Sequence, residues 1–124
     1  MLKLIFPLLG LYSCPLAMTD GAAKTIETLG PDLRQNSDLS EAFARLTSRE
    51  PEKFWTSGQW MTEKRGGSDV ARGTETLAVP QPDGTFRLYG YKWFSSATDS
   101  DMTLTLARIV AEDGTVGTIM LNKQ

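Results

Sequence analysis

Apolar residues recur at two different spacings along the chain, and the change falls near residue 48. Before that point they return every three or four positions, which predicts an amphipathic helix. We expect this helix to be capped at its start by Thr19 or Asp20 and to be ended by Gly30-Pro31. The apolar positions that carry the pattern are Ala22, Ala23, Ile26 and Leu29.

A second amphipathic helix is predicted to begin near Asp38, with Glu41 three residues later as its capping-box partner. Glu41 and Arg45 lie four residues apart on its polar face, where they can form an ion pair. The segment from Ser48 to Phe54 contains Pro51, which ends any helix, and is predicted to be a linker. The apolar face of the second helix consists of Leu39, Phe43 and Leu46.

Beyond the linker the pattern alternates, which predicts β-strands joined by short turns. Asp83-Gly84 is a tight-turn pair, and Glu112-Asp113-Gly114 marks a second turn. We therefore predict an α+β fold, with short N-terminal helices in residues 1–50 and an antiparallel β-barrel-like domain in residues 51–124. The predicted strands are Thr74–Val79, Thr85–Tyr89, a strand in which Met102, Leu104 and Leu106 alternate with Thr103 and Thr105, and Thr115–Leu121.

The first residues allow two interpretations. Met1-Leu2-Lys3 followed by the apolar run from Leu4 to Leu11 has the outline of a secretory signal, which would make this a small secreted β-protein. The run is interrupted by Pro7 and Gly10 and is too short to cross a bilayer, so no membrane span is predicted. The same run fits a buried helix, which we favour for a reason given below.

Composition removes several classes of function. The 124 residues contain no histidine, which excludes Ser-His-Asp and Cys-His triads and histidine-containing zinc sites. The single cysteine, Cys14, forms no internal disulfide and makes no thiolate metal site, so we predict no metal and expect Cys14 to be a small buried side chain. A net charge of -2, without a run of Lys or Arg, argues against contact with DNA or another polyanion.

The run Met61-Thr62-Glu63-Lys64-Arg65-Gly66-Gly67-Ser68-Asp69 holds two adjacent glycines flanked by hydroxyl, acidic and basic side chains. Paired glycines let the backbone approach a neighbour closely or adopt positive φ. Exposed N–H groups in such a turn can hold a carbonyl or an anion. The GxxxxGK[ST] spacing of a Walker A loop is missing. A solvated, charged hairpin turn is the alternative interpretation.

A second run, Lys92-Trp93-Phe94-Ser95-Ser96, directly follows a predicted strand. Two neighbouring aromatic residues usually belong to a hydrophobic core. A tryptophan beside hydroxyl groups can instead stack on a planar cofactor while a serine hydrogen-bonds to a ring nitrogen. Taken alone, the run leaves both interpretations open.

In this order and at this separation, the two runs resemble the acyl-CoA dehydrogenase family. The middle β-domain of that family carries a Thr-Glu-Pro-x-x-Gly-Ser-Asp loop, followed a few strands later by a Gly-x-Lys-x-Trp-Ile-Thr run. The loop corresponds to residues 62–69, and the run corresponds to Gly90-Tyr91-Lys92-Trp93-Phe94-Ser95. The hairpin of residues 83–90, Asp101 and the strand ending at Ala107-Arg108 also match.

Two features resemble the branch of this family that includes the bacterial alkylation-response flavoproteins. Lys64, followed by Arg65, stands where the family has a proline. Residues 14–22 resemble a helix-start segment that precedes the β-domain in that branch and is no export signal. The resemblance therefore favours a buried helical remnant for residues 1–17 and a cytoplasmic, mitochondrial or peroxisomal protein over a secreted one.

The resemblance implies FAD as the cofactor and an acyl-CoA-type small molecule as the substrate, which is dehydrogenated between its α and β carbons. Met61 and Thr62 would lie against the isoalloxazine ring, where hydrogen-bond donors stabilise the reduced flavin. Trp93 would pack on the flavin, Ser95 would lie near N5 and Ser68 would approach the acyl-thioester arm. The implied cofactor-binding residues are Trp60, Met61, Thr62, Trp93, Phe94 and Ser95.

Full members of the family continue into a C-terminal helical domain that supplies the catalytic carboxylate, much of the adenine-end contact and the interface of the homo-oligomer. We therefore expect a fragment without a catalytic residue, either a truncated product or an incomplete gene model, that is inactive alone. Glu63 and Asp69 are assigned to loop structure and turn capping. The alternative is a non-catalytic module that binds flavin or a partner.

Overall fold

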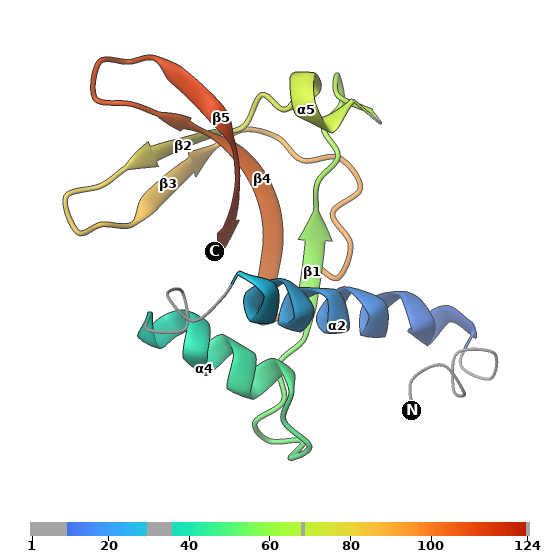
Figure 1. Cartoon of the computed structure of the whole chain (residues 1–124). Helices are drawn as coiled ribbons and strands as arrows, with labels where there is room; N and C mark the ends of the chain where they lie inside the picture. Colours follow the sequence, from blue (N-terminus) through green and yellow to red (C-terminus); the bar gives the residue numbers. More distant parts are fainter. Residues whose placement is uncertain (1–9, 30–35, 68, 124) are drawn as a thin grey trace. The chain divides into compact units, whose positions relative to one another are not determined.

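The computed structural model of the chain describes residues 10–29, 36–67 and 69–123 (Figure 1). It contains two compact units, one of Met1–Gly58 with Ala97–Met102 and one of Gln59–Ser96 with Thr103–Gln124. The chain passes between the units in strand β1 (Ser57–Trp60), after Ser96, and in strand β4 (Met102–Val110). The predicted domain boundary between residues 50 and 51 stays a prediction.

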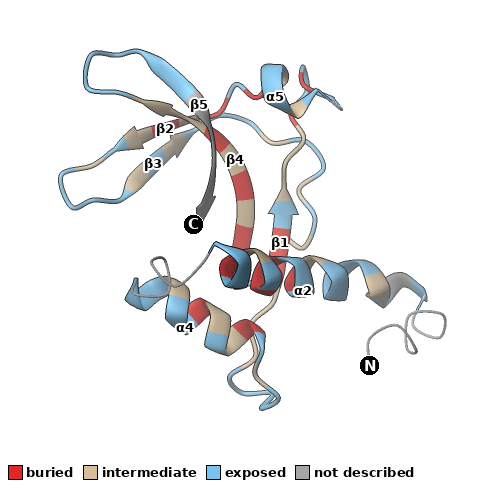
Figure 2. Cartoon of the chain, in the orientation of Figure 1, coloured by how far each residue is buried: buried red, intermediate tan, exposed pale blue. Residues whose placement is uncertain are grey.

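Two helices pack against each other in the first unit, and a 3-10 turn, η1 (Gly10–Tyr12), precedes them. They are α2 (Ser13–Thr28) and α4 (Ser37–Leu46). Small side chains at the contact allow two helix axes to approach closely, and Figure 2 shows the buried positions as stripes along both helices. The buried residues are Thr19, Ala22, Ala23 and Ile26 in α2 and Ala42 and Leu46 in α4.

The predicted N-cap of the first helix is wrong, because α2 begins at Ser13 and Thr19 lies inside it. The Thr19 hydroxyl donates to the Pro15 carbonyl at 3.0 Å and accepts from the backbone N–H of Ser57 at 3.1 Å. Thr19 therefore uses its hydroxyl in a tertiary contact. The predicted stop at Gly30-Pro31 lies outside the described residues, and α2 ends at Thr28.

The second helix also has a different cap from the predicted one. Asn36 is its N-cap, and its side-chain oxygen accepts from the N–H groups of Asp38 at 3.0 Å and Leu39 at 3.3 Å. Asparagine is among the preferred N-cap residues because its short side chain reaches these unpaired amides. The predicted pair of Glu41 and Arg45 is confirmed, with an oxygen-to-nitrogen distance of 2.8 Å.

The expected burial of residues 1–17 is wrong for those that are described. Residues 1–9 lie outside the described part of the chain. Tyr12 is 71% exposed, and Cys14 is exposed rather than buried. In the described residues we find no helix with both the length and the apolar character that crossing a membrane requires.

The second unit is built on a five-stranded sheet in the order β1-β4-β2-β3, with β5 (Val116–Lys123) paired to β4. Strand β2 (Leu77–Pro80) pairs antiparallel with β3 (Phe86–Tyr89), and β4 pairs antiparallel with β5. Strand β2 runs parallel to β4, with Leu77 opposite Arg108. The α+β class with short helices is confirmed, and the sheet is mixed rather than wholly antiparallel.

Two hairpin turns repeat the same construction, as the sequence predicts. In Asp83-Gly84-Thr85 the carboxylate accepts from the N–H of Thr85 at 3.0 Å and from its hydroxyl at 2.7 Å. In Asp113-Gly114-Thr115 the corresponding distances are 2.9 and 2.6 Å. Both glycines have φ near +80°, which a residue with a side chain rarely adopts. These hydrogen bonds hold the pKa of Asp83 and of Asp113 below its ordinary value.

The long strand β4 has both of its faces covered, with the threonine face more deeply buried than the leucine face (Figure 2). Thr103 and Thr105 are buried, whereas Leu104 and Leu106 are only half-buried. The Thr105 hydroxyl donates to the Trp60 carbonyl at 2.8 Å. In the described part of the chain the buried hydroxyl of Thr103 has no hydrogen-bond partner.

Candidate functional site

The loop that follows β1 is a tight turn stabilised from within. The N–H groups of Gly66 and Gly67 both donate to the Glu63 carbonyl, at 3.1 and 3.3 Å, so they are not free to hold an anion. Gly67 has φ +45°, as expected for one of the paired glycines. Gly66 lies against Gly73, so close that a Cβ added at position 73 would stand 2.3 Å from the Gly66 Cα. The glycines therefore serve the packing of the loop itself.

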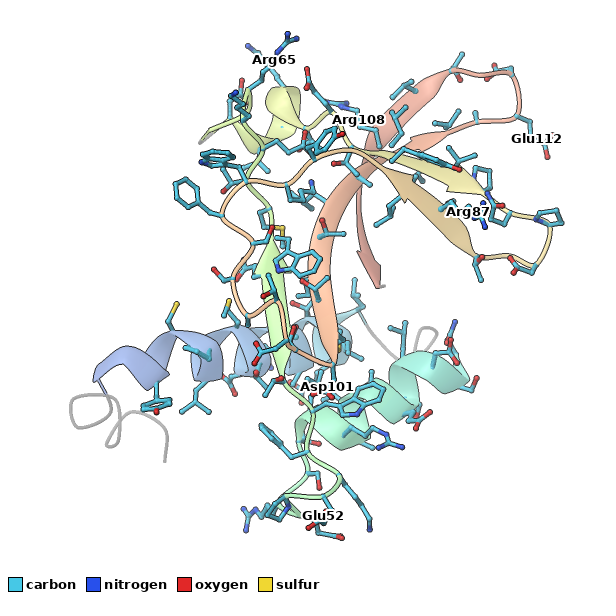
Figure 3. The ribbon with its side chains drawn as sticks, turned by 180° about the vertical axis from the view of Figure 1, so that it is seen from behind. Glu52, Arg65, Arg87, Asp101, Arg108 and Glu112 are labelled. Atoms are coloured by element: carbon cyan, nitrogen blue, oxygen red, sulfur yellow. The ribbon has the colours of Figure 1, made fainter. Side chains whose placement is uncertain are left out.

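The end of this loop leads into the short helix α5 (Val70–Gly73), which Asp69 caps by accepting from the N–H of Arg72 at 3.2 Å. The assignment of Asp69 to capping is confirmed. Ser68, the predicted contact for the acyl thioester, lies outside the described residues. Arg65 points away from the sheet and is largely exposed (Figure 3), with Glu75 at 3.4 Å.

Arg108 has a structural role that the sequence pattern did not predict. Its Nε donates to the Thr74 carbonyl at 2.7 Å, and its Nη2 donates to the Ala71 carbonyl at 2.7 Å. The side chain therefore joins β4 to the end of α5, close to the loop that carries Arg65 (Figure 3). A cationic side chain at a helix C-terminus is favourable because unpaired carbonyls gather there.

Glu63 lies at the centre of a buried hydrogen-bond network and is only 4% exposed. Its carboxylate contacts the Lys92 ammonium at 2.6 Å and accepts from the Thr76 hydroxyl at 2.5 Å. It also accepts from the N–H groups of Glu75 and Thr76, at 2.5 and 3.1 Å. Every oxygen of the carboxylate is thus engaged, which confirms that Glu63 has a structural role in the loop. These bonds also explain why β2 begins at Leu77 and not at Thr74 as predicted.

The network keeps Glu63 ionised. Burial opposes the charge, but the hydrogen bonds from Lys92, from the Thr76 hydroxyl and from the two backbone amides outweigh it and hold the pKa of Glu63 below its ordinary 4.5. A carboxyl group whose pKa is lowered by folding stabilises the folded state above its unfolded pKa. That contribution is lost as the pH falls through the folded pKa.

We therefore expect the unaltered chain to lose stability more steeply than the Glu63→Gln variant as the pH falls from neutral to well below 4.5. The difference between the two urea midpoints, measured across this range, isolates Glu63 from Asp83 and Asp113, which titrate in both proteins. A difference that stays constant with pH would contradict the assignment.

The second motif places its aromatic residues at the surface, so the alternative that they form a core is wrong. Trp93 is 52% exposed and Phe94 is 76% exposed. Their rings meet edge to face, with centroids 5.7 Å apart and planes at 79°. Phe94 has a positive φ of 61°, which is uncommon for a bulky residue and points to a constrained backbone. We call these two residues the aromatic pair.

The aromatic pair is tied directly to the first motif. The backbone N–H of Trp93 donates to the Thr62 carbonyl at 2.8 Å. Thr62 and Met61 are half-buried, so the two predicted ring-contact segments meet at one place in the second unit. Arg87 of β3 and Glu112 of the β4–β5 turn lie at the hairpins of this unit, away from α5 and Arg65 (Figure 3).

Trp60 and Ser95 line a pocket of about 260 Å³ in the second unit. The Trp60 ring N–H donates to the Ser96 carbonyl at 2.8 Å, and Gln59 pairs with Ser96 in an isolated β-bridge. Trp60 is therefore held by the protein itself. The pocket is lined by Trp60, Thr76, Leu88, Gly90, Lys92, Ser95 and Thr105.

An ungapped count of the second motif gives a register one residue later than the predicted one. Counted without gaps from Gly90 and Lys92, the Gly-x-Lys-x-Trp-Ile-Thr run places its tryptophan at Phe94 and its threonine at Ser96. By this count the roles predicted for Trp93 and Ser95 would pass to Phe94 and Ser96, and they stay predictions. Because Phe94 is the more exposed ring of the aromatic pair, this register also places the more accessible ring at the family's tryptophan position.

The comparisons with known proteins agree on one family. The model "Acyl-CoA dehydrogenase, middle domain" matches residues 58–123, more than half of the chain. The "Acyl-CoA dehydrogenase family member 11" of Caenorhabditis elegans is 59% identical over 91% of this chain and 18% of its own length. The "Putative acyl-CoA dehydrogenase AidB" of Escherichia coli is 37% identical over 77% of this chain and 18% of its own length.

Solved structures show the same likeness in three dimensions. The crystal structure of Caenorhabditis elegans ACDH-11 in complex with C11-CoA matches 98% of this chain and 21% of that chain, with 54% identity and a TM-score of 0.86. A structure described as "Bd2924 apo-form" matches 90% of this chain and 22% of that one, with 46% identity and a TM-score of 0.71. The chain thus spans about one fifth of the length of the proteins it matches.

Proposed function

Because the chain belongs to the acyl-CoA dehydrogenase family, we propose that it supplies part of the flavin and acyl-thioester site of an FAD-dependent dehydrogenase. FAD, when bound, would supply the acceptor for the hydride that leaves the β carbon of an acyl thioester, and the proton of the α carbon would pass to a general base. The part played by this chain is to hold the flavin ring and to position the thioester.

The observation that carries the proposal is the exposed aromatic pair beside Thr62. Large exposed apolar groups mark binding surfaces, and a planar ring system is a fitting occupant because aromatic faces stack on each other. The two motif segments are joined through their backbones at this point, which supports a shared surface for the rings and Thr62. Phe94 and Trp93 would pack against the flavin, and Thr62 would offer a hydrogen-bond donor.

We propose an acyl-CoA-type thioester as the substrate, supported by the relative whose structure is described as a complex with C11-CoA. Ser68 remains the predicted contact of this chain with the thioester arm. Glu63 does not act as a base in this proposal, because its carboxylate already accepts four hydrogen bonds. Asp69 is likewise engaged at the start of α5. These residues therefore contribute binding and orientation, and we expect no turnover from this chain alone.

Titration of FAD into the purified chain tests the proposal through flavin fluorescence, which stacking against aromatic rings quenches. We expect saturable quenching that Phe94→Ala weakens by about tenfold in Kd, because the more exposed ring of the aromatic pair is lost. Tyr89→Ala is the matched control, since Tyr89 is also an exposed aromatic residue of this unit but lies on β3.

Fluorescence that does not change on adding FAD would contradict the proposal and favour an interaction module that binds no flavin. Bleaching of the flavin absorbance by an acyl-CoA, at the rate of a complete enzyme, would contradict the expected lack of turnover.

A further inference from the structure

The two motif segments of the second unit are joined by two contacts that lie side by side. The backbone link runs from the Trp93 N–H to the Thr62 carbonyl at 2.8 Å. The side-chain link runs from the Lys92 ammonium to the Glu63 carboxylate at 2.6 Å. Thr62 and Glu63 are neighbours in the chain, and so are Lys92 and Trp93. A shift in one link must therefore move the other.

We propose that the Glu63–Lys92 ion pair positions Thr62 and the aromatic pair relative to each other, and so shapes the surface that receives the flavin ring. This inference rests on the proposed function for its consequence, but the geometry that it claims can be measured without a flavin. Glu63 and Lys92 are positioning residues here, since the ion pair acts through Thr62 and Trp93.

Lys92 is well placed for this role because its side chain runs into the interior. Only 11% of the side chain is exposed, and the ammonium also donates to the Leu106 carbonyl of β4 at 2.8 Å. A buried ammonium requires such partners, because water is no longer there to solvate it. Lys92 is therefore anchored both to the first motif and to the central strand of the sheet.

Glu63 is fixed just as firmly from the opposite side. Its partners Glu75 and Thr76 directly precede β2. The backbone N–H of Arg108 in β4 donates to the Thr76 carbonyl at 2.8 Å. Gly90, two residues before Lys92, lies so close to Thr76 that a Cβ would stand 2.5 Å from the Thr76 hydroxyl oxygen. The ion pair thus has a rigid support on both partners, which is what a positioning contact needs.

The test uses the whole chain and compares Lys92→Met with the control Lys53→Met. Lys53 pairs with Glu50 at 2.7 Å on the surface, so the control makes the same side-chain change at an exposed ion pair. Amide hydrogen exchange by NMR reports on the Trp93 N–H, and the Gln81 N–H of the β2–β3 turn is the reference within the same unit. FAD affinity is measured on the same samples.

In Lys92→Met we expect the Trp93 amide to exchange at least about tenfold faster while the Gln81 amide changes little. The Kd for FAD should rise by about the same factor, whereas Lys53→Met should leave both readouts unchanged. In the double variant Lys92→Met/Glu63→Gln, the exchange rate of the Trp93 amide and the Kd for FAD should rise no more than in the worse single variant, since both members of the ion pair act as one unit. The double variant also removes the uncompensated buried charge, so it provides the comparison if Lys92→Met does not fold.

Equal acceleration of the Trp93 and Gln81 amides would overturn the proposal, because it would mean that the ion pair only stabilises the unit as a whole. Selective loss of Trp93 protection in a chain that binds no FAD would uphold the positioning role while the proposed function fails. The opposite outcome is that the unaltered chain binds FAD while the Trp93 amide of Lys92→Met exchanges at an unchanged rate. It would uphold the proposed function and overturn the positioning role.

Discussion

Replacing Glu63 with alanine is expected to lower the free energy of unfolding by about 3–5 kcal/mol, the range found when one member of a buried ion pair is removed. The variant leaves the Lys92 ammonium, the Thr76 hydroxyl and two backbone amides without their shared acceptor. Each unpaired buried polar group adds its own desolvation cost. Urea denaturation followed by tryptophan fluorescence and circular dichroism measures the loss.

Glu50→Ala is the matched control for this experiment. Glu50 contacts Lys53 at 2.7 Å, a distance similar to that of the buried pair, but both side chains are more than 60% exposed. Exposed ion pairs contribute about 0–1 kcal/mol, so the control should change stability little. A similar decrease in the free energy of unfolding in both variants would show that burial does not make the Glu63 network more stabilising than an exposed ion pair.

A methyl group at position 90 is the second change with a large expected effect. In Gly90→Ala the new Cβ would lie 2.7 Å from the Cα of Thr76, a backbone atom that cannot rotate away, and 2.5 Å from the Thr76 hydroxyl oxygen. Forcing an extra carbon into such a contact costs about 1–3 kcal/mol. We expect a loss near the upper end of this range, together with weaker FAD binding, because the shift moves Lys92.

Gly21→Ala makes the same chemical change as Gly90→Ala, but we expect it to raise stability rather than lower it. Gly21 lies within α2, and a Cβ at this position meets no atom within 4 Å. Alanine favours a helix over glycine by about 0.5–1 kcal/mol, so this variant should be more stable than the unaltered chain. Thermal unfolding of both variants distinguishes steric conflict from helix propensity, and a stable Gly90→Ala would refute the close packing against Thr76.

Local features of the fold could be predicted from the sequence because the residues that decide them are neighbours in the chain. The Asp-Gly pairs specify both hairpin turns, and the Glu41–Arg45 pair follows from helical spacing alone. The two family motifs, short runs at a fixed separation, were enough to indicate the acyl-CoA dehydrogenase family, whereas the flavin and thioester site stays a prediction.

Other features depended on residues far apart in the chain, and the sequence pattern did not reveal them. Lys92 lies 29 residues from Glu63, and nothing local marks these two charges as partners. Thr19 was predicted to cap a helix, but its hydroxyl accepts a hydrogen bond from the backbone N–H of Ser57, 38 residues away. The parallel pairing of β2 with β4 likewise requires a crossover that alternating hydrophobicity does not specify. Aromatic character alone predicted burial for the aromatic pair, whereas both rings are at the surface.

The exposed thiol of Cys14 has a practical consequence for work with this protein. The chain has one cysteine, so any disulfide it forms must join it to another molecule, and a reducing agent should keep the preparation uniform. The same thiol offers one defined attachment point for a dye or spin label on the first turn of α2. Such a probe would report on the helical unit without altering any residue of the proposed flavin surface.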